Sequence, residues 1–134
     1  MESFTLANAQ QIRSYRDLRV WQKSVDLVAE VYSVTKRIPR RGNENLAIQL
    51  QRAAVSIPAS IAEGHGRHHL SDYLHHLSIA SGSLTELESH FLLAERLALL
   101  PGSDVERVLL STSDVSRMLA GLTKALLARK QSLL

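Results

Sequence analysis

Apolar residues recur every three or four positions along most of the chain, which is the spacing that places side chains on one face of an α-helix. This pattern predicts four helices, over residues 17–38, 43–63, 71–100 and 103–130. The third is the most regular, because its apolar positions alternate steps of three and four without a break. No segment has the strict alternation of apolar and polar residues that is typical of a strand. The pattern therefore predicts an all-α protein.

The ends of the predicted helices depend on residues with known end preferences. Asp17 is expected as the N-cap of the first helix and Ser103 as that of the fourth, because their short side chains can accept a hydrogen bond from the first turn. Glu106, three residues after Ser103, would complete a capping box. Pro39 and Gly64 are expected to stop the first and second helices.

Only a few residues connect one predicted helix to the next, and short connections make consecutive helices antiparallel neighbours. We therefore expect an up-down-up-down antiparallel four-helix bundle over residues 15–130. Residues 1–14 are polar and without a periodic pattern, so they are interpreted as a flexible arm, and residues 131–134 as a frayed end.

The first helix carries two apolar stripes. One stripe contains Leu18, Trp21, Val25, Val28 and Tyr32. The other contains Val20, Leu27, Val31, Val34 and Ile38. At about 100° per residue the two stripes lie on opposite sides of the helix. A monomeric bundle needs one apolar face per helix, so the second face predicts a partner subunit.

Two runs of small residues interrupt the middle of the second and third helices. Pro58 lies in the run AAVSIPASIA, where an interior proline costs about 3 kcal/mol or bends the axis. The third helix carries IASGS, in which Gly82 costs about 1 kcal/mol relative to alanine. We expect these runs to pack against each other or against a neighbouring chain. The residues predicted to have a packing or structural role are Arg52, Pro58, Glu63, Gly64, Gly82, Ser83 and Glu86.

The net charge of +3 is unevenly distributed. Residues 1–67 hold ten Lys or Arg against six Asp or Glu, whereas residues 68–134 hold six against seven. A basic half of this kind is typical of proteins with anionic partners, nucleic acid first. The candidate nucleic-acid-binding residues are Arg16, Arg19, Lys23, Lys36, Arg37, Arg40, Arg41 and Arg67.

No catalytic or metal-binding motif accompanies these charges. The chain has no cysteine, and its six histidines form neither HExxH nor the pair of ExxH motifs of di-metal bundles. Arg52, Glu63 and Glu86 are interpreted as ion-pairing residues, because nothing beside them supplies a nucleophile. We therefore expect no enzyme, no metal and no cofactor. With no signal sequence and no membrane-spanning segment, the expected location is the cytoplasm.

Three blocks of this sequence strongly resemble one protein family: YRDLRVWQKSVDLV, QLQRAAVSIPASIAEGHGR and YLHHLSIASGSLTELESHFLLAERL. The family is that of the bacterial four-helix-bundle proteins of intervening sequences in large-subunit ribosomal RNA genes. The accessory variability determinant of diversity-generating retroelements is similar to it. The resemblance implies a homopentameric barrel with a positively charged surface and no enzymatic activity. For the retroelement relatives it implies binding to nucleic acid and to a reverse transcriptase.

Two functions are compatible with these observations. One is a homopentameric adaptor that binds RNA or DNA, as an accessory factor to a reverse transcriptase or another protein. This chain has Gln51 and Ser81 where the family often has basic residues, so binding is expected to be weak and sensitive to salt. The alternative is an oligomeric scaffold that binds only protein. Neither involves a membrane.

Overall fold

The computed structural model describes residues 12–132 of the chain. Four long helices make up most of this part: α2 (Arg19–Thr35), α3 (Glu44–His65), α4 (Leu70–Arg96) and α5 (Gly102–Ser132). A short 3-10 turn, η1 (Tyr15–Asp17), precedes α2. Residues 12–132 contain no strand.

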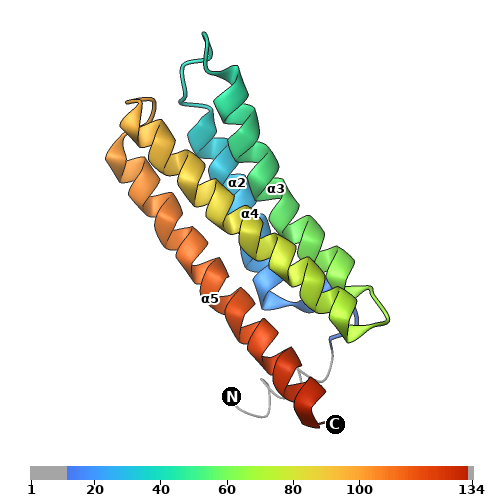
Figure 1. Cartoon of the computed structure of the whole chain (residues 1–134). Helices are drawn as coiled ribbons and strands as arrows, with labels where there is room; N and C mark the ends of the chain where they lie inside the picture. Colours follow the sequence, from blue (N-terminus) through green and yellow to red (C-terminus); the bar gives the residue numbers. More distant parts are fainter. Residues whose placement is uncertain (1–11, 133–134) are drawn as a thin grey trace.

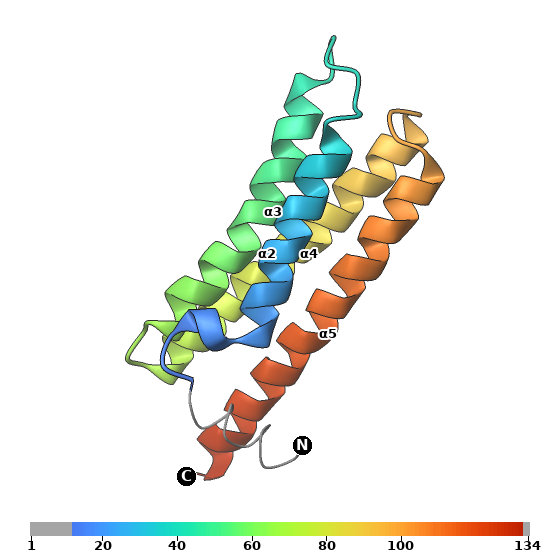
Figure 2. The same cartoon turned by 180° about the vertical axis from the view of Figure 1, so that it is seen from behind.

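Consecutive helices run in opposite directions, and α5 packs against both α4 and α2, which closes the bundle (Figures 1 and 2). The most extensive interface joins α3 to α4, whereas α5 makes smaller interfaces with its two neighbours. α3 and α5 lie diagonally and do not contact each other. The four-helix bundle predicted from the sequence is confirmed.

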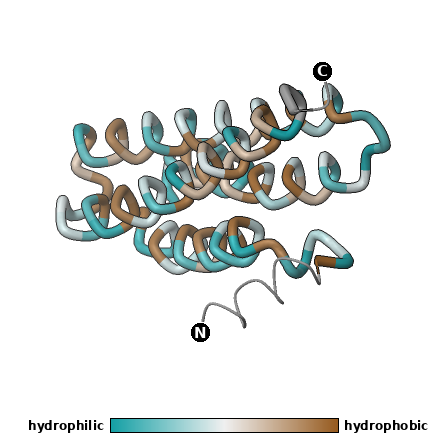
Figure 3. The backbone as a smooth tube through the Cα atoms, turned by 90° about the horizontal axis from the view of Figure 1, so that it is seen from below, coloured by the Kyte–Doolittle hydropathy of each residue, from teal (hydrophilic) through white to brown (hydrophobic). Residues whose placement is uncertain are grey.

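Each helix turns one apolar stripe to a common core. Hydrophobic residues recur along every helix, with hydrophilic residues between them, as expected for a helix with one apolar face (Figure 3). The largest fully buried side chains include Phe91, Leu27, Leu50, Ile57, Ile61, Leu77 and Leu87. Within residues 12–132 no helix combines the length and the apolar character needed to cross a lipid bilayer.

The two apolar stripes predicted for the first helix have different environments. Val20, Leu27 and Val31 belong to the buried stripe and lie in the core. In the opposite stripe, Val25 is 38% exposed and Tyr32 is 41% exposed. One apolar face of α2 is therefore partly open in the single chain.

The prediction that Asp17 caps the first helix is wrong. α2 begins at Arg19, and Asp17 closes the preceding turn, where its carboxylate accepts hydrogen bonds from the backbone N–H groups of Arg13 (2.9 Å) and Ser14 (3.3 Å). These bonds hold the pKa of Asp17 below its usual value. The prediction that Ser14 belongs to a flexible arm is wrong, because its hydroxyl accepts a hydrogen bond from the backbone N–H of Arg16. Residues 1–11 of that predicted arm lie outside the described part of the chain.

The prediction that Gly64 ends the second helix is wrong, because Gly64 lies within α3. α3 continues to His65 and is capped by Gly66, whose N–H donates to the carbonyl of Ala62. Gly64 is buried where α3 crosses α4, and a Cβ atom at this position would lie 2.8 Å from the Cβ of His76. Its role in the fold is therefore close helix packing rather than termination.

The third helix ends four residues earlier than predicted. α4 stops at Arg96, and Ala98 adopts a left-handed conformation with φ of 58°. The N–H of Leu99 then donates to the carbonyl of Ala94 at 2.9 Å, five residues back, which is the closing bond of a Schellman motif. Because alanine is uncommon in this conformation, the helix end could not be recognised from the residue types.

The start and the end of the fourth helix also differ from the prediction. α5 begins at Gly102, so Ser103 lies inside the helix, and the carbonyl of Pro101 accepts hydrogen bonds from the N–H groups of Asp104 and Val105. At its other end α5 continues to Ser132, past the predicted limit at residue 130. Residues 133–134 lie outside the described part.

Candidate nucleic-acid interface

Seven of the eight candidate cations lie at the two ends of α2, and the eighth, Arg67, follows α3. Arg16, Arg19 and Lys23 are near its start, on the same end of the bundle as Arg67. The others follow its last turn and lie in the loop before α3. The 17 residues of α2 span roughly 25 Å at ~1.5 Å per residue, so the two groups are well separated within one chain. The two groups therefore do not form one basic surface within a single chain. That the eight cations form one continuous surface in an assembly is a prediction.

Lys36, Arg40 and Arg41, which we call the loop cluster, are exposed cations beside the N-terminus of α3. None of the three forms an ion pair with another residue of the described region. Gly42, at φ of 85°, completes the turn in a conformation that favours glycine. The loop cluster thus presents its charge to solvent.

The N-terminus of α3 next to the loop cluster lacks a side-chain cap. Asn43 is the N-cap residue, but its amide group donates instead to the carbonyl of Pro39 at 2.9 Å. The N–H groups in the first turn of a helix carry a partial positive charge and attract anions when nothing caps them. This end of α3 therefore adds to the positive potential of the loop cluster. In the same turn the carboxylate of Glu44 opposes that potential with one negative charge.

Arg37 differs from its neighbours because its guanidinium is already held in an ion pair. Its guanidinium lies 2.7 Å from the carboxylate of Asp104, which is only 4% exposed and also binds Arg107 at 2.5 Å. The hydrogen bonds from Arg37 and then from Arg107 hold the pKa of Asp104 below its usual value. Arg37 therefore joins the end of α2 to the start of α5, and it is a poor candidate for binding phosphate.

The cations at the other end of α2 have mixed surroundings. Arg67 pairs with Glu63 at 3.2 Å, one helical turn away, and the guanidinium of Arg16 lies 5.9 Å from the ring centre of Tyr15. Arg19 and Lys23 are exposed, with no ion pair to another described residue. This end therefore also holds available cations, and the N-terminus of α2 beside them likewise lacks a side-chain cap.

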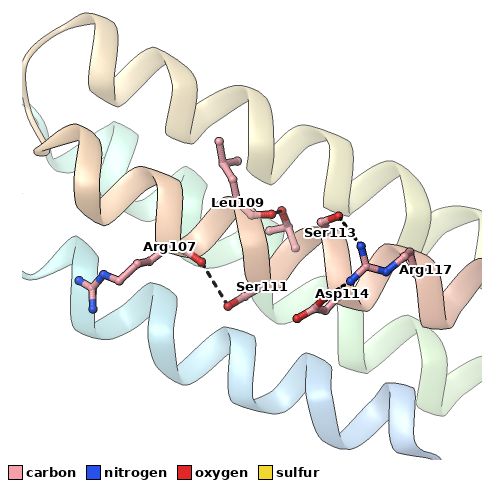
Figure 4. A network of polar contacts seen from close by, with 7 residues as sticks. Arg107, Leu109, Ser111, Ser113, Asp114 and Arg117 are labelled. Atoms are coloured by element: carbon pink, nitrogen blue, oxygen red, sulfur yellow. Dashed lines mark hydrogen bonds and ion pairs between the residues drawn. The ribbon is translucent and has the colours of Figure 1, made fainter.

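Two cations of α5, Arg107 and Arg117, have carboxylate partners on the same helix, and Figure 4 shows the contact of Arg117 with Asp114. Arg117 forms an ion pair with Asp114, and Arg107 reaches Asp104. The hydroxyl of Ser111 donates to the carboxylate of Glu30 at 2.7 Å, which joins α5 to α2. These contacts stabilise the helix and its position, so Arg107 and Arg117 are poor candidates for binding phosphate.

The histidines occupy separate positions. His65 packs edge-on against Tyr73, and His90 lies 3.4 Å from Glu86. Nδ1 of His76 is buried without a hydrogen-bond partner and lies 3.9 Å from the carboxylate of Glu63. No three His, Asp or Glu side chains of residues 12–132 are placed so that they could hold a metal ion together.

The small-residue runs of α3 and α4 meet in the middle of their interface. The hydroxyl groups of Ser56 and Ser83 form a hydrogen bond between α3 and α4, and the Ser56 hydroxyl also lies 3.2 Å from the carbonyl oxygen of Ala53. Pro58 lies inside α3, which continues past it without a break. Gly82 is not part of this contact. It is exposed, and a Cβ atom there would have nothing within 4 Å.

Sequence reasoning missed Asp104, although this buried carboxylate joins two arginines. Its sequence signal is weak, because an acid in the first turn of a helix is common and only the fold brings Arg37 beside it. Arg52 is exposed on α3 without an ion pair among the described residues, whereas Glu86 has His90 as its partner.

Comparisons with known proteins point to one family. The sequence model described as 23S rRNA-intervening sequence protein matches residues 16–121. A crystal structure described as a protein with unknown function from the S23 ribosomal protein family, from Bacteroides thetaiotaomicron VPI-5482, has a similar fold with a TM-score of 0.70. The two chains are 20% identical over 78% of this chain and 98% of the other. A comparison with curated proteins finds no match. The match of the family model over most of the bundle shows that this chain belongs to the 23S rRNA-intervening sequence protein family.

Proposed function

We propose that the protein is a non-catalytic homopentamer that binds RNA or DNA and acts as an adaptor, holding the nucleic acid near a second protein such as a reverse transcriptase. The observation that carries this proposal is the loop cluster, in which Lys36, Arg40 and Arg41 are exposed, without ion pairs among the described residues, in the loop that leads to the N-terminus of α3. Cations without carboxylate partners are free to neutralise phosphates. The positive end of α3 supports the same contact.

Assembly would multiply a weak contact. One loop cluster offers three cations, so a single chain is expected to bind weakly. In a ring of five chains the five clusters lie at the same rim, because each follows the same end of α2. Binding of one cluster then raises the effective concentration of the others along one nucleic acid, which increases the overall affinity.

An exposed apolar surface on α2, α3 and α4 supports the oligomer. Tyr32, Ile48, Val55 and Ile79 are each between 41% and 44% exposed. Tyr32, Ile48 and Val55 line a groove of about 410 Å³. Contiguous exposed apolar residues commonly mark a protein interface. We call these four residues the outer face and propose that a neighbouring subunit covers it, with Arg52 available to pair with an acid across the contact.

Val55→Asp is expected to dissociate the assembly into single chains. In the free chain Val55 is 44% exposed, so aspartate is tolerated there, whereas burial of an unpaired carboxylate in an interface is costly. Native mass spectrometry would show a pentamer for the wild type and a monomer for the variant. Leu110→Asp, on the diagonally opposite helix α5, is the matched control and should leave the pentamer intact. A Val55→Asp variant that remains pentameric would contradict the proposed interface.

Removal of the loop cluster is expected to weaken nucleic-acid binding and its dependence on salt. Each cation that neutralises a phosphate of single-stranded RNA adds ~0.7 to the steepness with which log K falls against the logarithm of the salt concentration. Changing Lys36, Arg40 and Arg41 to glutamine should therefore make this slope shallower by about 2 for each chain that binds. Fluorescence anisotropy with a labelled mixed-sequence RNA at several salt concentrations would measure this slope.

The control removes the same charge from the other end of α2. Changing Arg16, Arg19 and Lys23 to glutamine gives an equal net charge, so the two variants separate a local contact from general attraction. An equal loss of slope in both would exclude the loop cluster as the binding site. A wild-type pentamer that binds no RNA, with its mass unchanged by added RNA, would favour the scaffold that binds only protein.

A further inference from the structure

A pocket lies beside the loop cluster, at the end of the bundle where the chain turns from α2 into α3 (Figure 2). Its volume is about 280 Å³, close to the lower limit of ~300 Å³ for small-molecule sites. Two cations of the loop cluster, Lys36 and Arg40, line it together with residues of the first turns of α3. A nucleic acid held by the loop cluster would therefore pass beside this pocket, which we call the loop pocket.

The loop pocket combines apolar side chains with exposed charges. Ile38 is only 3% exposed and Ala47 is half-buried, whereas Lys36 and Arg40 are exposed. A nucleotide has the same division, because its flat base and its charged phosphate lie on opposite sides of the sugar. A base that packs against the aliphatic side chains loses contact with water, while its phosphate stays beside the cations.

The amide group of Gln51 has a fixed orientation in the loop pocket. The hydroxyl of Thr35 donates its hydrogen to the carbonyl of Tyr32 at 3.2 Å, so it can only accept from Nε2 of Gln51, at 3.1 Å. This bond uses one of the two amide hydrogens, and Oε1 accepts no hydrogen bond from another described residue. Gln51 therefore keeps one donor and one acceptor for a ligand.

Two further acceptors of the loop pocket are without donors. Asn43 donates through Nδ2 to the carbonyl of Pro39, but its Oδ1 accepts no hydrogen bond within the described part of the chain. The exposed carboxylate of Glu44 forms no ion pair with any described residue. Together with Oε1 of Gln51, these oxygens favour a base edge that carries hydrogen-bond donors.

The bases differ in the donors that they offer to such a pocket. Cytosine, adenine and guanine each carry an exocyclic amino group, from which a carboxylate or amide oxygen can accept. Uracil has only a ring N–H, which lies between two carbonyl oxygens that a carboxylate repels. The acceptors of the loop pocket therefore discriminate against uracil.

We propose that the loop pocket binds one unpaired base with an exocyclic amino group, while Lys36 and Arg40 hold the neighbouring phosphates. Provided that the protein binds nucleic acid as proposed above, the pocket adds recognition of an unpaired strand to a general attraction of charge. A base within a duplex cannot enter, because its edge is paired and its faces are stacked. Of the outer face, only Ile48 lines the loop pocket, so the pocket is formed within a single chain beside the proposed subunit contact.

Short labelled oligomers of cytidine and of uridine, equal in length, test this preference, because both are pyrimidine strands with the same phosphates. Fluorescence anisotropy at neutral pH should show that the wild type binds the cytidine oligomer about five- to tenfold more tightly, the lower part of the range for one good base contact. Ala47→Leu fills the loop pocket without changing any charge and should bring this ratio close to one. Ala120→Leu adds the same volume to the groove between α4 and α5, so it is the matched control and should leave the ratio unchanged.

Glu44→Gln tests the acceptors rather than the space. Its amide can donate to the oxygens of uracil as well as accept from cytosine, and the lost negative charge no longer repels phosphate. The affinity for both oligomers should therefore rise, while the ratio between them falls toward one. Circular dichroism should show native helix content in all three variants, because Glu44 and Ala120 are exposed and Ala47 borders the empty pocket.

Several outcomes would contradict the base pocket. Salt-dependent binding of both oligomers with a wild-type ratio near one would overturn it and leave the proposed function intact. A preference for cytidine that persists in Ala47→Leu would place the recognised base elsewhere. Displacement of the oligomer by an equal concentration of cytidine monophosphate would assign the pocket to a free nucleotide rather than to a strand. Failure to bind either oligomer would overturn the proposed function together with the base pocket.

Discussion

Gly64→Ala is expected to lower the free energy of unfolding by about 1–3 kcal/mol, the usual cost of overpacking. A Cβ atom at Gly64 would lie 2.8 Å from the Cβ of His76 and 3.3 Å from the backbone carbonyl of Tyr73. Neither atom is the free end of a flexible side chain, so α3 and α4 would have to separate locally. These two helices share the largest interface of the bundle, which makes the separation costly. Urea unfolding followed by circular dichroism would measure the loss.

Two other helical glycines provide matched controls. A Cβ atom at Gly82 of α4 or at Gly121 of α5 would have nothing within 4 Å. Replacing either with alanine should raise the unfolding free energy of the dissociated chain by up to about 1 kcal/mol, the gain in helix propensity. The interpretation of Gly64 as a packing residue would be wrong if all three alanine variants became more stable by similar amounts.

Asp104→Asn is expected to destabilise the bundle at neutral pH and to have little effect in acid. The arginines beside Asp104 lower its pKa in the folded state, so the carboxylate binds its proton more readily when the chain is unfolded. The stabilisation is therefore complete above the ordinary aspartate pKa of about 3.9 and is lost as the pH falls through the lowered value in the folded state. Thermal unfolding at pH 7 and at pH 3 would measure the difference between wild type and variant.

The control for Asp104 is another aspartate of α5. Asp114 pairs with Arg117, but both side chains are well exposed, at 60% and 71%, and such pairs contribute little to stability. Asp114→Asn should thus have a much smaller effect at pH 7. A destabilisation by Asp104→Asn that is equally large at pH 7 and pH 3 would show that packing, rather than charge, explains the role of this residue.

The helices and their order could be predicted from the sequence because they depend on local periodicity and loop length. The stripe through Leu77, Leu84, Leu87 and Phe91 is readable from spacing alone, and it is the buried face of α4. The ends were less predictable. Asp17 has the chemistry of an N-cap, but it closes a separate turn because Ser14 provides a better-placed partner three residues earlier.

The candidate site could be predicted only as a set of charges. The basic residues of the loop cluster are evident from the sequence, but whether each is available depends on partners far along the chain. Arg37 and Asp104 are 67 positions apart, and no local pattern connects them. The sequence likewise predicts a helix end at Gly64 and close packing at Gly82, and only the crossing of α3 over α4 shows that Gly64 is the closely packed residue.

The order of the helices around the bundle also has a kinetic consequence. Among the four long helices, every pair in contact except α2 with α5 is consecutive in the chain. The contact order is therefore low, and little entropy is lost in closing loops before the contacts form. Helical proteins of this topology fold in microseconds to milliseconds, so each chain is expected to acquire its fold well before it meets the partners that complete an assembly.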